Sequence, residues 1–172
     1  GVDGRLHVSD TGAKCRTTED YVLAVQGLGV PFNPDFNGAS QYGVGTMQYT
    51  THRGRRCNAV EAFLEPAIET GRVTIKTNCT VSRIIVENGA CTGAVFIDNG
   101  REATVRCNAE VLLAAGSYAT PKLLMLSGIG PADDLQRLGI PVILNRPQVG
   151  ANLQDHLDLF VIAECTGPHT YD

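Results

Sequence analysis

The residues best suited to hold a ligand lie in one stretch of the chain, between Val111 and Gly130. Its first residues, Val111 to Leu113, are apolar and predict a strand that is buried on both faces. Ala114 to Ser117 follow, and their small side chains would let another backbone or a flat ligand come close. Thr120 is predicted to cap a helix whose first residue is Pro121. This order of strand, small-residue turn and helix suits a ligand site at the end of a sheet, although close packing alone would explain the turn equally well.

A second candidate for ligand binding is a basic cluster formed by His52, Arg53, Arg55 and Arg56. Arginine side chains suit anionic groups such as phosphate because they donate paired hydrogen bonds. A solvated turn whose arginines pair with nearby carboxylates is the simpler interpretation, and on the sequence we favour it.

No arrangement of acids, histidines or cysteines predicts a catalytic or metal centre. Asp155 and His156 are adjacent, and neighbouring side chains on an extended chain point to opposite faces, so we expect only structural polar contacts from them. The six cysteines form no C-x-x-C pair and have no histidine at ligand spacing, so structural zinc is not expected. Scattered thiols of this kind favour a reducing compartment, and we expect a cytoplasmic protein.

The elements that would position these residues begin with a β-region in the middle of the chain. Its apolar residues alternate with a period of two, and asparagine–glycine pairs mark tight turns. Strands are predicted at Val73 to Lys76, Thr80 to Glu87, Cys91 to Ile97 and Glu102 to Cys107. Together they predict an antiparallel meander that leads into the buried strand at Val111.

The first seventy residues have helical periodicity on either side of a long loop. Thr17 and Asn58 are each followed three positions later by an acidic residue, which is typical of a helix start. Pro66 must kink or end the second of these helices. The stretch from Val30 to Gly45 is rich in glycine, proline and asparagine and predicts a loop. Loops of this length are often functional or covered by another part of the protein.

After Gly130 the pattern predicts a short helix from Pro131 to Leu138 and a final strand at Leu157 to Glu164. The whole chain has 172 residues and a net charge of −4, which fits one ordinary domain and gives no reason to expect nucleic acid or an anionic membrane as a partner. No apolar run is long enough to cross a bilayer. The chain begins at Gly1 with no signal-peptide pattern, and we expect an excised fragment.

One segment resembles a known family closely. Gly116 to Gly130, GSYATPKLLMLSGIG, is similar to the second signature of the glucose–methanol–choline (GMC) oxidoreductases, which use FAD. Asp35 to Gly38 (DFNG), Arg53 to Ala59 (RGRRCNA) and Gly150 to His156 (GANLQDH) also resemble segments of that family, in its order. The resemblance covers nearly the whole chain.

The resemblance implies FAD as the cofactor, with hydride transfer from an alcohol carbon to the flavin and a histidine that removes the alcohol proton. It implies that Val81 lies against the adenine ring, whereas the residues alone would make Val81 ordinary core. Cofactor contacts are then expected from Val81, Ala115, Gly116 and Ser117. The family's catalytic histidine lies in a segment with no match here, so no catalytic residue and no metal site are assigned. His7, His52, His156 and His169 all lie in other contexts.

The fold class expected is α/β with α+β character, as part of an FAD-binding fold. Residues 1–50 would belong to or adjoin the substrate region, residues 51–156 would form part of the FAD-binding domain, and residues 157–172 would begin the substrate domain. The sequence lacks the G-x-G-x-x-G turn that would hold the pyrophosphate of FAD. We therefore expect the chain alone to be inactive, to retain no FAD and to self-associate through exposed sheet edges.

The expected function of the parent protein is the FAD-dependent oxidation of a small alcohol by a dehydrogenase or oxidase, with choline among the plausible substrates. Two alternatives stay open on the sequence. One is a lyase built on the same flavoprotein scaffold. The other is a non-catalytic interaction module that uses the loop at Val30 to Gly45, which would go with a self-contained α+β domain unrelated to flavin.

Overall fold

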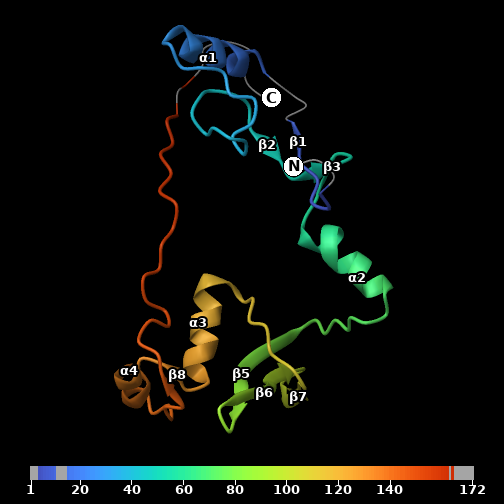
Figure 1. The fold of residues 1–172 in the computed structure, drawn as a ribbon, viewed down its shortest axis with the longest axis vertical. Helices are drawn as coiled ribbons and strands as arrows, with labels where there is room; N and C mark the ends of the chain where they lie inside the picture. The colour runs from blue at the N-terminus through green and yellow to red at the C-terminus, as the bar shows by residue number, and fades with distance from the viewer. Residues whose placement is uncertain (1–3, 11–14, 163, 165–172) are drawn as a thin grey trace. The chain divides into compact units, whose positions relative to one another are not determined.

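The computed structural model describes residues 4–10, 15–162 and 164, which belong to two units (Figure 1). The first unit contains the described residues of Gly1–Thr74 and Phe160–Asp172. The second unit is Ile75–Leu159 and carries all the residues predicted to contact a cofactor.

The second unit is built on a three-stranded antiparallel sheet in the order β5-β6-β7. Its strands are β5 (Cys79–Glu87), β6 (Ala90–Asp98) and β7 (Arg101–Arg106). Asn88 and Gly89 turn the chain between β5 and β6 with positive φ angles of 53° and 77°, and Asn99 and Gly100 do the same between β6 and β7. Asparagine and glycine tolerate this conformation at low cost, so the predicted meander is confirmed at these three strands.

The central strand β6 carries the core of this unit. Gly93, Ala94, Val95 and Phe96 are consecutive and all buried, and Val95 is only 2% exposed. Because successive side chains on a strand point to opposite faces, β6 is covered on both sides.

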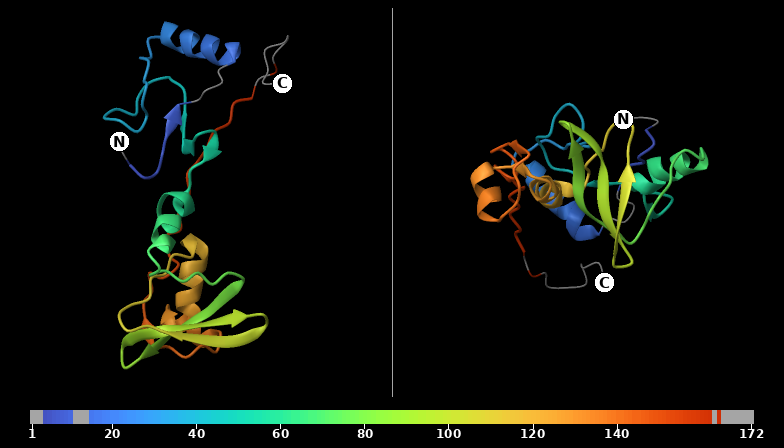
Figure 2. Two further views of the ribbon diagram at one scale, coloured as in Figure 1. Left: turned by 90° about the vertical axis from the view of Figure 1, so that its right-hand side faces the viewer. Right: turned by 90° about the horizontal axis from the view of Figure 1, so that it is seen from below.

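Helices lie beside the sheet (Figure 2). The elements are α3 (Gly116–Leu126), β8 (Ile129–Gly130), α4 (Ala132–Arg137) and β9 (Leu144–Asn145), and β8 pairs with β9 in parallel. The predicted start of α3 at Thr120 and Pro121 is wrong: the helix begins at Gly116 and Pro121 lies inside it. Gly128, with a positive φ of 80°, follows the end of the helix.

Three predicted strands are wrong. Residues 73–76, 111–113, and 157–162 with 164 adopt no strand, and Leu112 is 82% exposed rather than buried. A strand needs a neighbour for its backbone N–H and C=O groups. Within the described part of the chain no segment pairs with any of the three, so they run as unpaired chain.

The first unit has a helix and two short antiparallel strand pairs, followed by a second helical segment. The elements are α1 (Arg16–Gly27), the pair β1 (Ser9–Asp10) with β2 (Gln48–Tyr49), and the pair β3 (Thr51–His52) with β4 (Arg55–Arg56). The predicted cap at Thr17 is wrong, because α1 begins at Arg16. The predicted loop at Val30 to Gly45 is confirmed, and it is organised by the buried Asn33, whose amide nitrogen donates to Ser40 O and Tyr42 O.

A helical segment after β4 shows how one proline is accommodated. Asn58 Oδ1 accepts hydrogen bonds from the N–H groups of Val60 and Glu61, which confirms the predicted cap. The chain then forms a π-helix, η1 (Val60–Leu64), followed by α2 (Glu65–Glu69). The helix therefore continues past Pro66, so the expectation that it ends there is wrong. The wider π turn directly precedes the proline, whose ring would clash with the preceding turn of a regular α-helix.

Candidate functional site

The start of α3 brings three of the four predicted cofactor contacts together. Ala115 is the residue that caps this helix, Gly116 is its first residue and Ser117 is its second. No side chain of the cap bonds to the first turn, although the Ala115 N–H donates to Thr120 Oγ1 at 3.1 Å. The first amides of a helix have no partner within the helix, so at an exposed start they can meet a ligand. We call Ala115, Gly116 and Ser117 the α3 start.

The backbone conformation at position 116 favours glycine, whereas the space around it would accept a larger side chain. Its φ is 86°, a conformation that residues with a Cβ rarely adopt. A Cβ built at Gly116 would have no atom within 4 Å. The space beside the α3 start is therefore open, and a ligand can approach the backbone there.

An apolar hollow of about 350 Å³ adjoins the α3 start. Ser117 lines it, together with Gly150 and Leu153 of the segment GANLQDH. Tyr118, which the sequence analysis missed, also lines it and is 75% exposed. Its neighbours in the hollow are Pro121, Lys122, Met125, Leu126, Leu138 and Ile140. An aromatic residue directly after Ala114 to Ser117 was the signal in the sequence that could have marked Tyr118.

Val81, the fourth predicted contact, lies on β5 and is 45% exposed. The pairing of β5 with β6 shifts between Val81 and Arg83, so an irregularity follows Val81 directly. No hydrogen bond links Val81 to the α3 start within the described residues, and Val81 does not line the apolar hollow. The structure thus groups Ala115, Gly116 and Ser117 and leaves Val81 on a separate element of the same unit.

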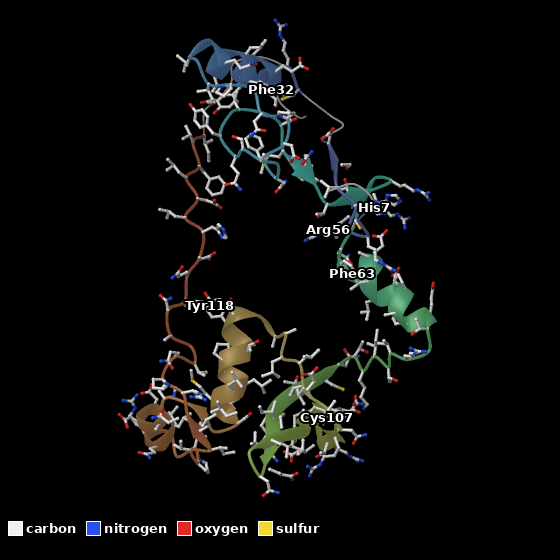
Figure 3. The ribbon with its side chains drawn as sticks, viewed as in Figure 1. His7, Phe32, Arg56, Phe63, Cys107 and Tyr118 are labelled. Atoms are coloured by element: carbon white, nitrogen blue, oxygen red, sulfur yellow. The ribbon has the colours of Figure 1, made fainter. Side chains whose placement is uncertain are left out.

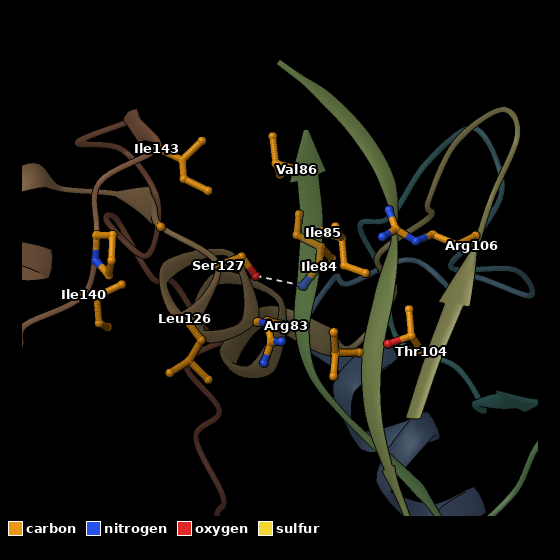
Figure 4. Close-up of a pocket in the computed structure, with 13 residues that line it drawn as sticks. Arg83, Ile84, Ile85, Val86, Thr104, Arg106, Leu126, Ser127, Ile140 and Ile143 are labelled. Atoms are coloured by element: carbon orange, nitrogen blue, oxygen red, sulfur yellow. Dashed lines mark hydrogen bonds between the residues drawn. The ribbon is translucent and has the colours of Figure 1, made fainter. Parts of the chain in front are cut away.

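A second hollow, of about 430 Å³, lies between β5, the end of α3 and the chain at 140–143 (Figure 4). The buried Ser127 lies at its wall, where Ser127 Oγ accepts a hydrogen bond from the Ile84 N–H at 2.9 Å and donates to Leu123 O at 2.6 Å. None of the four predicted cofactor contacts lines this hollow. Ser127 in its wall instead joins the end of α3 to β5.

Arg106, which also lines the second hollow, belongs to a surface network with Glu87 and Thr92. Arg106 donates to Glu87 Oε2 at 2.6 Å, and Thr92 Oγ1 donates to the same oxygen at 2.8 Å. The hydrogen bond from Arg106 lowers the pKa of Glu87, and the bond from Thr92 adds a smaller effect in the same direction. The bond to Glu87 in turn raises the pKa of Arg106. The bond to Asp98 likewise raises the pKa of Lys76 on the far end of the sheet. These shifts report surface ion pairs and not a catalytic group.

The remaining polar candidates form no catalytic constellation. Asp155 and His156 are exposed, and Asp155 Oδ1 accepts a hydrogen bond from the His156 backbone N–H at 2.8 Å. His7 and His52 stack on each other in the first unit, and His169 lies outside the described residues. Among the residues that the structure covers, no group of three acids, histidines or cysteines could hold a metal ion.

The basic cluster does not have the carboxylate partners expected for it. The five ion pairs of the described chain all involve other cations, namely Arg16, Lys76, Arg83, Arg106 and Arg137. Arg53, Arg55 and Arg56 are exposed on and beside the β3–β4 hairpin. The side chain of Arg56 is labelled in Figure 3. The interpretation as a turn paired with local carboxylates is therefore wrong within the described residues.

Comparison with known protein families identifies the chain. The family model described as GMC oxidoreductase matches residues 1–158. The chain belongs to the GMC oxidoreductases. The small-residue turn at the α3 start and the segment GANLQDH beside it are thus family segments that this fold brings to one hollow.

Two curated relatives of the chain are choline dehydrogenases. The chain is 43% identical over 168 residues to the oxygen-dependent choline dehydrogenase of Sinorhizobium medicae, which covers 98% of the chain and 30% of that protein. It is 40% identical over 170 residues to the mitochondrial choline dehydrogenase of Homo sapiens, covering 99% of the chain and 29% of that protein. The chain therefore spans about 30% of the length of these relatives.

Two solved enzyme structures resemble the fold of this chain. An FAD-dependent oxidoreductase from Chaetomium thermophilum matches with a TM-score of 0.80 and 28% identity, covering 86% of this chain and 26% of that one. A pyridoxine 4-oxidase from Mesorbium loti matches with a TM-score of 0.79 and 28% identity, covering 86% of this chain and 29% of that one. In the described part of this chain, no helix has the length and apolar character required to cross a bilayer.

Proposed function

We propose that the protein containing this chain is an FAD-dependent oxidoreductase that oxidises a small primary alcohol, with choline as the first candidate. The observation that carries the proposal is the match to choline dehydrogenases, which extends over 98% of this chain at 43% identity. Identity of this degree over the whole segment supports a shared substrate class. The choice of electron acceptor is left to experiment.

The part played by this chain is to hold the cofactor. FAD, when bound, supplies the hydride-accepting chemistry of the reaction. The open space at Gly116 and the unbonded first amides of α3 fit the close approach of a flat polar ligand. Gly116 and Ser117 would donate backbone hydrogen bonds, and Ala115, whose N–H is bonded to Thr120 Oγ1, would let the ligand come close to its backbone. Val81 would add an apolar contact for the adenine ring. No residue of this chain is assigned to proton removal.

The chain alone should neither retain FAD nor oxidise an alcohol. Each contact from Val81 or the α3 start is worth roughly 1–2 kcal/mol. A few such contacts barely offset the ~4–15 kcal/mol cost of immobilising a ligand, so any affinity should be about millimolar at best. Titrating FAD into the purified chain while following flavin fluorescence checks this. Binding at micromolar FAD would contradict it and would show that other residues dominate the affinity.

Three further parts of the proposal follow the sequence analysis. The division at residues 50/51 and 156/157 into substrate, FAD-binding and substrate segments is one of them. A cytoplasmic location is the second, supported by the five free thiols among the described cysteines. Self-association of the isolated chain is the third, supported by the many apolar side chains exposed on its surface, and light scattering would measure it.

The experiment that tests the function uses the full-length protein. Purified protein should show the absorption of bound flavin, and choline should bleach it under anaerobic conditions. A colourless protein that takes up no FAD on reconstitution would refute the proposal. A flavoprotein that choline does not reduce, but another alcohol does, would keep the reaction class and change the substrate.

A further inference from the structure

The β3–β4 hairpin sorts its cationic side chains onto two faces. His52 lies opposite Arg55 in the ladder, and Thr51 lies opposite Arg56. Residues opposite each other in an antiparallel pair share a face, with Cβ atoms about 4.5–5.5 Å apart. His52 and Arg55 therefore lie on one face, and Arg56 lies on the other.

A second histidine completes the first face. The rings of His7 and His52 stack with their centroids 4.0 Å apart and an angle of 27° between the planes. The segment that carries His7 is fixed to the hairpin through the buried Cys57, whose Sγ accepts from the His7 N–H at 3.4 Å. We call the group formed by His7, His52 and Arg55 the imidazole face. In Figure 3 the side chains of His7 and Arg56 lie apart, on different sides of the ribbon in this region.

The hairpin keeps its positive charge without local compensation. None of Arg53, Arg55 and Arg56 forms an ion pair with a described carboxylate. Arg53 also has a positive φ of 50°, and the other four non-glycine residues with positive φ in the described part of the chain are all asparagine. An arginine is a poor choice for this conformation, where asparagine or glycine is favoured. The turn therefore carries a charged arginine at a position where the backbone conformation disfavours it.

From this arrangement we infer that the imidazole face is a binding site for a phosphate group. The Arg55 guanidinium offers paired donors that match two oxygens of a phosphate, and each imidazole can donate to another oxygen. The uncompensated charge of the hairpin favours a dianion over a neutral ligand. Neither the α3 start nor flavin takes part, so this inference does not rest on the proposed function.

The test compares Arg55 and Arg56, which are adjacent in the sequence but lie on opposite faces of the hairpin. Pyrophosphate is titrated into the 172-residue chain without flavin, and the NMR signals of the His7 and His52 ring protons are followed. We expect the ring-proton signals to shift and to saturate as pyrophosphate is added. Binding should be about tenfold weaker in Arg55→Ala, which loses charged hydrogen bonds to the ligand. It should be less than about twofold weaker in Arg56→Ala, which loses only a screened long-range attraction. His7→Phe, which keeps a ring beside His52 but removes its donors, should weaken binding severalfold.

The source of the phosphate group is decided by two further ligands, ADP and adenosine. Equal binding of ADP and pyrophosphate would assign free phosphate or pyrophosphate as the ligand, whereas tighter binding of ADP would assign a nucleotide. Equal losses in Arg55→Ala and Arg56→Ala would overturn the inference, because only general charge attraction would remain. Binding of adenosine as tightly as ADP, or no saturable shift with pyrophosphate up to about 10 mM, would also overturn it.

Discussion

Ser127 and Ile84 are joined by a buried hydrogen bond in which the Ile84 N–H donates to Ser127 Oγ at 2.9 Å. β5 has a neighbouring strand, β6, on one side only, so its other edge has no strand partner within the sheet. The Ser127 hydroxyl takes the place of a strand partner for the Ile84 N–H, and it donates its own hydrogen bond to Leu123 O in α3. The end of α3 is thereby fixed to the edge of the sheet.

Replacing Ser127 by alanine should destabilise the second unit. The Ile84 N–H would be buried without a partner, which typically costs about 1–3 kcal/mol of the free energy of unfolding. The exposed Ser117 on the same helix is the matched control, and Ser117→Ala should change this free energy by less than about 0.5 kcal/mol. Urea denaturation of both variants measures the difference, and equal midpoints would show that the bond contributes nothing.

Gly128 and Gly139 separate backbone strain from steric clash. Both have left-handed φ angles, 80° and 72°, but a Cβ at Gly128 would lie 2.5 Å from Pro141 O, whereas one at Gly139 meets no atom within 4 Å. Gly139→Ala should cost about 1–2 kcal/mol for the backbone alone. Gly128→Ala should cost about 1–3 kcal/mol more, because the chain at Pro141 must move. Thermal unfolding of the two variants gives the comparison, and similar costs would argue against the clash.

Gly116→Ala should weaken FAD binding by the full-length protein beyond its effect on folding. A Cβ at φ 86° strains the α3 start and narrows the open approach to it, so we expect the Kd for FAD to rise about tenfold. Gly100→Ala is the control, because Gly100 has a similar φ of 77° and equally open surroundings in the β6–β7 turn. Flavin release on dialysis and the unfolding midpoint are measured for both. If Gly100→Ala loses flavin as readily, the effect comes from stability.

The Glu87–Arg106 pair should make stability depend on pH in the acid range. The pKa of Glu87 is lowered in the folded protein, so its contribution is present above its ordinary value of 4.5 and is lost as the pH falls through the folded-state pKa. Glu87→Gln should therefore be less stable than the original chain at neutral pH, and the difference should vanish in acid. Urea midpoints across the pH range measure it. A difference that persists in strong acid would mean that Glu87 acts through packing and not through its charge.

The sequence predicted the parts of the fold that depend on neighbours in the chain. The turns at Asn88-Gly89 and Asn99-Gly100 need only two residues with the right backbone preference, and the strands around them alternate clearly. Asn58 caps its own helix for the same local reason. These features were correct because propensity and structure agree over a few residues.

The errors arose where a distant partner decides the structure. The apolar residues 111–113 fit the pattern of a buried strand. A strand forms only where a second segment pairs with it, and the local pattern cannot show whether such a segment is present. The bond between Ser127 and Ile84 spans 43 positions and left no periodic signal in the sequence. At the α3 start, Thr120 and Pro121 looked like a helix beginning, whereas the left-handed Gly116 begins the helix one turn earlier. The structure brings Ala115, Gly116 and Ser117 together at the start of α3 but leaves Val81 on β5, and the role of all four as cofactor contacts stays a prediction.

The strands of the meander pair with segments that are close in the sequence, and this affects the order in which the second unit folds. Contacts between β5, β6 and β7 close small loops, which form quickly and at low entropic cost. Docking of α3 through Ser127 closes a much longer loop, so it should follow once the sheet exists. The residues beside the hollow at Ser117 would thus be among the last of the second unit to become ordered during folding, and among the first to open when that unit loosens.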